Sequence, residues 1–209
     1  MALGFPLGLA DFFNRLPISE STFEWPEAVE VNETQGGQLV RAELGERLWQ
    51  GEVRLDVMTA AEAREALALI NLARGGPASF VGTDAGRRYP AADPNGAGLS
   101  GISPVLAAVS PDGREVDIGG LVAGYQLRAG DLVSLTYGSP LKYGLHEIVT
   151  GQTASAAGIA TALEIVPQLR PGWSIGQAVR LANPICRAVI VPGSVQPGQR
   201  RAGIVRGAG

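Results

Sequence analysis

Residues 128–149, RAGDLVSLTYGSPLKYGLHEIV, decide the fold prediction. Apolar residues alternate with others on both sides of a Gly-Ser-Pro sequence, which is typical of two antiparallel strands joined by a turn. The alternation places one set of first-strand residues on a common face, namely Val133, Leu135 and Tyr137. His146, the only histidine of the chain, lies in the second run and is expected to point to solvent or to a cross-strand partner. The stretch therefore predicts a β-hairpin and no catalytic site.

The composition extends this prediction to the whole chain. Of 209 residues, 29 are glycine and 14 are proline, and no short period organises them. Such a density of turn formers favours many short elements and a β-rich fold. Hydrophobic residues make up 45% of the chain and charged residues 18%, which is typical of a globular protein.

The second half of the chain consists of short apolar runs separated by glycine or proline. It follows a loop-rich stretch, residues 82–104, which is the natural domain boundary. Runs spaced by about 8–12 residues predict a small sandwich or barrel. The runs are VLAAVS, EVDIGGL, YQLRAGDLVSLTY, KYGLHEIVTG, IATALEIVP, AVRLANP and CRAVIVPG.

The first half predicts two strands and a helix. Residues 38–44 and 48–57 are interpreted as a strand pair, and the second strand alternates strictly. Its buried face is expected to hold Trp49, Gly51, Val53, Leu55 and Val57. Its wet face is expected to line a channel or a contact between subunits, and consists of Gln50, Glu52, Arg54 and Asp56.

A capping box marks the start of the helix. Thr59 and Glu62 have the T-x-x-E spacing that satisfies two backbone donors at a helix N-terminus. Apolar residues then recur at helical spacing up to Gly75-Gly76. A helix is predicted over residues 60–74. Residues 1–35 are expected to be irregular apart from a short helical face of Phe12, Phe13 and Leu16, and the tail after Gly193 to be an arm or a flexible end.

Candidate chemistry is sparse. Cys186 and His146 are a possible nucleophile and base, but forty positions separate them, and a buried, unreactive cysteine is the expected state. The sequence Asp93-Pro94-Asn95-Gly96 lacks the rest of a calcium loop and is predicted to be a turn. No catalytic residue, cofactor or metal site is predicted, and the chain is not expected to be an enzyme.

The charge and hydropathy patterns exclude two further classes. The net charge is −3, which argues against a protein whose main task is to grip nucleic acid. One small basic patch departs from this acidic balance. It lies at the C-terminus, is formed by Arg200, Arg201 and Arg206, and is expected to be solvated. No apolar run reaches membrane-spanning length, and the N-terminus does not have the pattern of a signal peptide.

Several segments together resemble tail proteins of long-tailed bacteriophages and prophages of alphaproteobacteria. They are FPLGLADFFNRLPI, INLARGG and RRYPAADPNG in the first half, and LRAGDLVSL with HEIVTGQTASAAGIATALEIVPQLRPGWSIGQAVRLANP in the second. The chain is most similar to the distal tail proteins, and the segments cover about two-thirds of it. The matching residues are turns and strands and include no catalytic position.

The resemblance implies a structural role. Distal tail proteins form a six-fold ring that joins the tail tube to the baseplate hub, and DNA passes through without specific binding. The implied partners are other copies of the chain, the tail tube protein, the hub, the tape measure protein and receptor-binding proteins. The implied location is the tail tip of the virion, after synthesis in the host cytoplasm.

The resemblance also implies a fold that is mainly β. Residues 1–88 would form a tail-tube-like β-sandwich or barrel with one flanking helix, to which residues 185–209 return. Residues 100–184 would form a second small β-barrel or sandwich, inserted into the first domain. Two alternatives stay open: a receptor- or carbohydrate-binding module, although Tyr125, Tyr137, Tyr143 and Trp173 are scattered, and a tube or terminator subunit.

Overall fold

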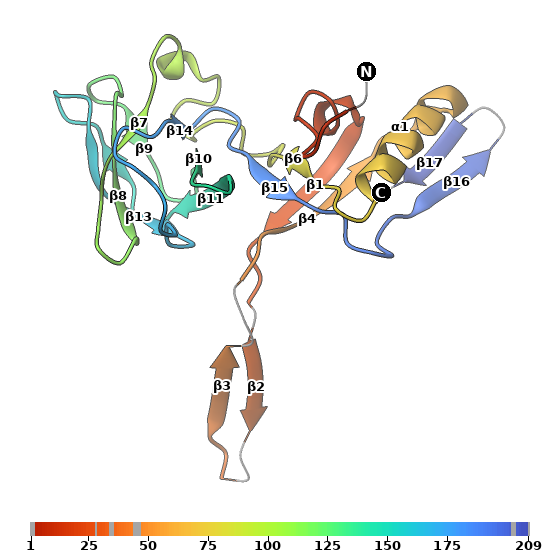
Figure 1. The fold of residues 1–209 in the computed structure, drawn as a ribbon, viewed down its shortest axis with the longest axis horizontal. Coiled ribbons are helices and arrows are strands. Elements are labelled where there is room, and N and C mark those ends of the chain that lie inside the picture. Colours follow the sequence, from red (N-terminus) through yellow and green to blue (C-terminus); the bar gives the residue numbers. More distant parts are fainter. Residues whose placement is uncertain (1–2, 28, 34–35, 44–46, 202–203, 209) are drawn as a thin grey trace.

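The computed structural model describes residues 3–27, 29–33, 36–43, 47–201 and 204–208. Strands make up 37% of the structure and helices 11%, so the predicted mainly β fold class is confirmed. Two hydrophobic cores organise the described residues (Figure 1). We call residues 105–181 the barrel region, and residues 3–82 with 185–208 the base region.

The barrel region is one nearly closed antiparallel sheet. Its six strands pair in the order β14-β10-β11-β13-β8-β7. An isolated bridge between Val105 and Ala178 connects the two ends of that order. The strands are β7 (Val105–Val109), β8 (Glu115–Gly119), β10 (Leu132–Tyr137), β11 (Lys142–Ile148), β13 (Ala160–Val166) and β14 (Val179–Arg180), with a small extra pair formed by β9 (Gln126–Leu127) and β12 (Gln152–Thr153).

The predicted hairpin is the centre of this sheet. Strands β10 and β11 pair in register, with Val133 opposite His146 and Ser134 opposite Leu145. The predicted alternation is confirmed, because Val133, Leu135 and Tyr137 all lie in the barrel core. Gly138 begins the turn with a φ of 80°, a left-handed conformation that glycine adopts without steric cost.

The base region combines several small sheets with one helix. Its core includes Leu7, Phe12, Phe13, Met58 and Val205, and it is separate from the core of the barrel. Its elements are η1 (Phe13–Arg15), β1 (Ile18–Glu24), β4 (Gln50–Leu55), β5 (Met58–Thr59), α1 (Ala60–Ala73), β6 (Phe80–Gly82), β15 (Cys186–Ala188), β16 (Pro197–Arg201) and β17 (Ile204–Ala208). A short 3-10 helix, η2 (Ala97–Leu99), lies in the loop between the two regions.

Helix α1 begins where the sequence predicts it. The backbone N–H of Glu62 donates to the Thr59 hydroxyl, and the Glu62 carboxylate accepts from the Thr59 backbone N–H at 2.8 Å. The Thr59 hydroxyl also donates to this carboxylate at 2.9 Å, and the bonds from the Thr59 N–H and hydroxyl hold the pKa of Glu62 below its usual value. The helix turns one apolar face to the base core, namely Ala63, Ala66, Leu69, Ile70 and Ala73.

The last strands of the chain pair with strands of its first half. Strand β15 pairs with β6, and β17 pairs with β5. The predicted arm or flexible end after Gly193 is therefore wrong for the described residues, since β16 and β17 form a hairpin that continues a three-stranded sheet. Arg200 and Arg201 lie on β16, and Arg206 lies on β17. These pairings are what an inserted second module requires, and the domain boundaries themselves stay a prediction.

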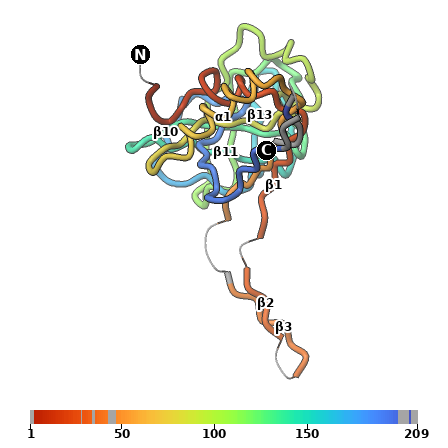
Figure 2. Tube along the Cα trace, turned by 90° about the vertical axis from the view of Figure 1, so that its right-hand side faces the viewer, coloured from red at the N-terminus to blue at the C-terminus, as the bar shows by residue number. Residues whose placement is uncertain are grey.

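The projecting part of the molecule lies elsewhere. Strands β2 (Val29–Glu33) and β3 (Leu39–Glu43) form a hairpin that extends well away from the body (Figures 1 and 2). We call residues 29–43 the arm. The prediction that residues 1–35 are irregular apart from a short helical face is wrong, because besides η1 they contain the strands β1 and β2.

The predicted pairing of residues 38–44 with 48–57 is also wrong. Strand β3 pairs with β2, and β4 pairs with β1. The chain reverses at Gly36-Gly37, where Gly37 has a φ of 78°, and not between the two predicted strands. The described residues between 18 and 55 thus run out and back as one long ribbon. Leu44, the last residue of the predicted first strand, lies outside the described residues.

Candidate interaction site

The wet face of β4 is exposed. Gln50, Glu52, Arg54 and Asp56 all face solvent, while Leu55 is buried and Val53 is half-buried. Arg54 forms ion pairs across and along the sheet, 3.2 Å from Glu20 and 3.6 Å from Glu52. Gly51 and Val57 were predicted on the buried face but are exposed, Val57 because the strand ends at Leu55. The role of the wet face in a channel or ring contact stays a prediction.

The arm exposes apolar side chains. Relative exposure is 55% for Val31, 73% for Leu39 and 52% for Val40. Directly opposite residues of an antiparallel pair share a face, so Val29, Val31 and Leu39 lie together on one side of the arm. Carboxylates accompany them, since Glu27, Glu30 and Glu33 are exposed and only Glu27 forms an ion pair within the described residues, with Arg41 at 2.9 Å.

An aromatic cluster fixes the root of the arm. The rings of Phe23 and Trp49 stack with centroids 5.2 Å apart, and Trp25 lies 6.5 Å from Trp49. The Arg47 guanidinium sits 3.7 Å from the Trp25 ring centroid and donates to the carbonyls of Trp25 and Pro26. A cation over an indole face is a favourable contact. The two strands leaving the body are therefore held together before the arm begins.

The root also touches the barrel. The indole N–H of Trp49 donates to the carbonyl of Leu145 on β11 at 3.0 Å, across 96 positions of sequence. The Arg87 guanidinium lies 6.0 Å from the Trp49 ring centroid. Base, barrel and arm root thus meet around one indole ring.

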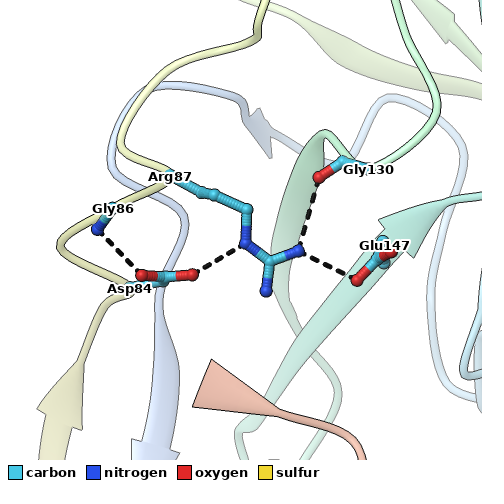
Figure 3. Close-up of polar contacts among 5 residues, drawn as sticks. All are labelled: Asp84, Gly86, Arg87, Gly130 and Glu147. Atoms are coloured by element: carbon cyan, nitrogen blue, oxygen red, sulfur yellow. Dashed lines mark hydrogen bonds and ion pairs between the residues drawn. The ribbon is translucent and has the colours of Figure 1, made fainter. Parts of the chain in front are cut away.

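Arg87 is the ionic centre of this junction (Figure 3). It forms ion pairs with Asp84 at 2.7 Å and with Glu147 on β11 at 2.9 Å, and it donates to the carbonyl of Gly130. Burial acts to lower the Arg87 pKa, but the bonds to Asp84 and Glu147 outweigh it and raise the pKa. Asp84, which is 7% exposed, also accepts from the Gly86 N–H at 2.8 Å. The guanidinium links the loop at Asp84 to Gly130 and to Glu147 on β11, so the network is a structural clamp between these segments.

Three further hydrogen bonds complete the junction. The Ser134 hydroxyl on β10 accepts from the Ile185 N–H at 2.9 Å, and Asn183 N–H donates to the Arg88 carbonyl at 2.6 Å. Asp131 accepts from the backbone of Ala91 at 2.8 Å. The outward faces of β10 and β11 are consequently covered by the base region and its linkers.

A cleft of about 1180 Å³ opens beside the junction. Both regions line it with apolar side chains, among them Leu16 and Ile18 from the base and Ile102 and Val179 from the barrel side. Its charged lining residues are Arg88 and Arg180, and no carboxylate is among the described residues that line it. Both arginines are exposed, and neither forms an ion pair with a described residue.

His146 does not face solvent, so that part of its prediction is wrong. It is 2% exposed, and its neighbour Leu145 is 3% exposed, because both faces of β11 are covered. Its Nδ1 lies 2.6 Å from the Pro167 carbonyl, which only accepts, so Nδ1 carries the proton of the neutral ring. Nε2 is buried without a partner among the described residues. Burial lowers the His146 pKa to about 4.

Cys186 lies half-buried on β15. Burial raises the pKa of its thiol to about 11, and only the thiolate is a good nucleophile. The Cys186 thiol is held neutral, and the His146 imidazole is hydrogen-bonded to the Pro167 carbonyl. The two side chains therefore do not form a nucleophile and its base.

The remaining candidates are structural where the residues are described. The Asp93 carboxylate accepts from the N–H groups of Ala97 and Gly98 and from the Tyr125 hydroxyl, as expected of a turn. Of the scattered aromatic residues, Tyr125 and Tyr137 are buried in the barrel core, and Trp173 packs against it. Within the described residues, no group of three His, Cys, Asp or Glu side chains is placed to hold a metal ion. No described helix has the length and apolar character to cross a membrane.

No family model and no curated protein matches the chain.

The features that form the junction and the arm root, above all Arg87, Trp49 and Trp25, were missed in the sequence. The only signals were two tryptophans close to Arg47 and the Gly36-Gly37 pair, and neither indicates which distant residues they contact.

Proposed function

We propose that the chain is a structural subunit of the tail tip of a long-tailed bacteriophage. As a distal tail protein, it would form a six-fold ring that joins the tail tube to the baseplate hub around the DNA channel. Its partners would be other copies of itself, the tail tube protein, the hub, and the tape measure and receptor-binding proteins. The proposal rests on the sequence resemblance and on a fold suited to assembly.

The observation that carries the proposal is the arm. An isolated two-stranded hairpin is marginally stable in water, yet this one extends from the body with Val31, Leu39 and Val40 exposed. Its aromatic root holds its direction. A feature of this kind is favourable when another chain covers it, which is the situation of a subunit in an assembly.

Two further observations support the proposal. The sheet of β1 and β4 has two strands, so each has an outer edge that pairs with no described strand. Unpaired edges are sites where neighbouring subunits add to a sheet. The wet face of β4 carries Glu52 and Asp56 beside Arg54, and a face without a net basic charge lets DNA pass without holding its phosphates.

The test is the mass and shape of the purified full-length chain. We expect light scattering to give the mass of six copies and negative-stain images to show rings with an open centre. A monomer at every concentration up to the solubility limit would contradict a self-assembling ring. It would favour a lone receptor-binding module, for which binding to a glycan array is the next measurement.

A further inference from the structure

We propose that the arm of one copy docks into the cleft of a neighbouring copy. This inference rests on the proposed function, because it names the contact by which copies would assemble. It assigns the occupant of the cleft as the described residues of the arm, 29–33 and 36–43, of a second copy of this chain.

The apolar side chains of the arm are not buried by the rest of their own molecule. Val31 and Leu39 lie on one face and Val40 on the other, and all three are more than half exposed. The arm leads away from the body in both views (Figures 1 and 2). The apolar surface that would cover it therefore belongs to another molecule.

The cleft has the size and surface for such a segment. Pockets for small molecules occupy roughly 300–1,000 Å³, and this cleft, at about 1180 Å³, is larger. Its lining is mixed polar and apolar, and its half-buried apolar residues Leu16, Ile18 and Ile102 can contact the valines and leucine of the arm.

The charges of the two surfaces are complementary. Residues 27–46 contain five glutamates and one arginine before Arg47 at the root. Of these, Glu30 and Glu33 are exposed and free of ion pairs with described residues. The cleft presents Arg88 and Arg180 with no described carboxylate among the residues that line it. Opposite potentials on two surfaces fix the register and speed the encounter.

The contact would be heterologous, since the arm and the cleft are different surfaces. Each copy then gives an arm to one neighbour and receives an arm from another. Repetition of such a contact closes a ring when the rotation between copies allows it. The junction around Arg87 and Trp49 fixes the angle between arm root and cleft wall, and so contributes to that rotation.

Cysteine cross-linking tests the contact directly. In a Cys186→Ser background, one batch carries Val31→Cys in the arm and a second carries Ile102→Cys in the cleft, so every disulfide joins two molecules. We expect mixing under mild oxidation to give at least roughly tenfold more cross-linked dimer than an arm batch mixed with Val122→Cys, an exposed barrel position. Equal yields from the two mixtures would overturn the proposal.

Charge reversal separates this inference from the proposed function. We expect Arg88→Glu with Arg180→Glu to raise the concentration needed for self-association by at least roughly tenfold. Mixing that variant with Glu30→Lys/Glu33→Lys should restore the assembly, with circular dichroism confirming that both variants fold. Rings that form unchanged in both variants would overturn the arm–cleft contact and leave the ring standing. A wild-type chain that never self-associates would overturn both.

Discussion

In the barrel region, the six strands pair within one sheet, and the bridge between Val105 and Ala178 connects its ends. In the base region, residues 18–55 form a ribbon whose strands pair two by two, and the outer half of the ribbon stands apart from the body. The barrel core holds 17 buried residues and the base core 11, among those described.

The difference separates two uses of β structure. A sheet that returns to its first strand satisfies its own backbone groups and buries its own inner apolar face. A ribbon with open edges and exposed apolar residues does neither. The barrel therefore pairs its strands within its own sheet, and under the proposed function the ribbon is the part whose surface is suited to a partner.

The largest expected effect tests the barrel. Leu163→Ala removes a fully buried side chain from the core, and we expect the free energy of unfolding to fall by about 2–5 kcal/mol. Leu39→Ala in the arm is the matched control, and its effect on the monomer should stay within about 0.5 kcal/mol. Urea unfolding of both variants measures the comparison, and equal losses would contradict it.

The second prediction concerns the junction between the regions. Arg87→Ala leaves the buried Asp84 carboxylate and Glu147 without their ion pairs, so we expect a loss of about 2–3 kcal/mol. Arg88→Ala removes a neighbouring arginine that has no ion pair with a described residue, and should change the free energy of unfolding by less than about 0.5 kcal/mol. If the two variants unfold alike in urea, Arg87 does not clamp the regions.

The third prediction concerns His146 and pH. Its pKa is about 4 in the folded protein and near 6.5 in an unfolded chain. The unfolded chain therefore binds an extra proton between these values, and stability falls as the pH falls. We expect a loss of about 2 kcal/mol between pH 7.5 and pH 5.

The control for that pH profile is His146→Gln. This variant should lose most of the pH dependence above pH 5, because carboxylates titrate mainly below that value. Unfolding midpoints measured in a pH series would reveal it. A wild-type profile that is flat from pH 7.5 to pH 5 would mean that His146 is not buried as a neutral ring.

The smallest predicted effect lies at the start of α1. Thr59→Ala removes the hydroxyl that accepts from the Glu62 N–H, and we expect a loss of about 1 kcal/mol. Thr59→Ser retains the capping oxygen and should cost much less. Thermal unfolding of the pair measures the difference, and a Thr59→Ser variant as unstable as Thr59→Ala would show that the cap is not the cause.

Local patterns made part of the fold predictable. The hairpin of β10 and β11 follows from alternation around a turn, and the start of α1 follows from four consecutive residues, because each signal lies within the element that it forms. The exposed face of β4 could be predicted for the same reason, because it follows from alternation within one strand. The arm was missed because the reversal at Gly36-Gly37 is not the nearest candidate turn, and pairing β1 with β4 depends on strands far apart in the chain.

The sequence by itself determined the strands of the barrel region, where the helix begins and which face of β4 stays wet, since these depend on residues a few positions apart. Only the tertiary structure decided the junction and the cleft. Arg87 meets Glu147 across 60 positions, and Trp49 meets Leu145 across 96. Leu145, on the outward face opposite Ser134, became buried because the base region covers that face. Such contacts depend on how two regions pack, and no local spacing encodes that packing.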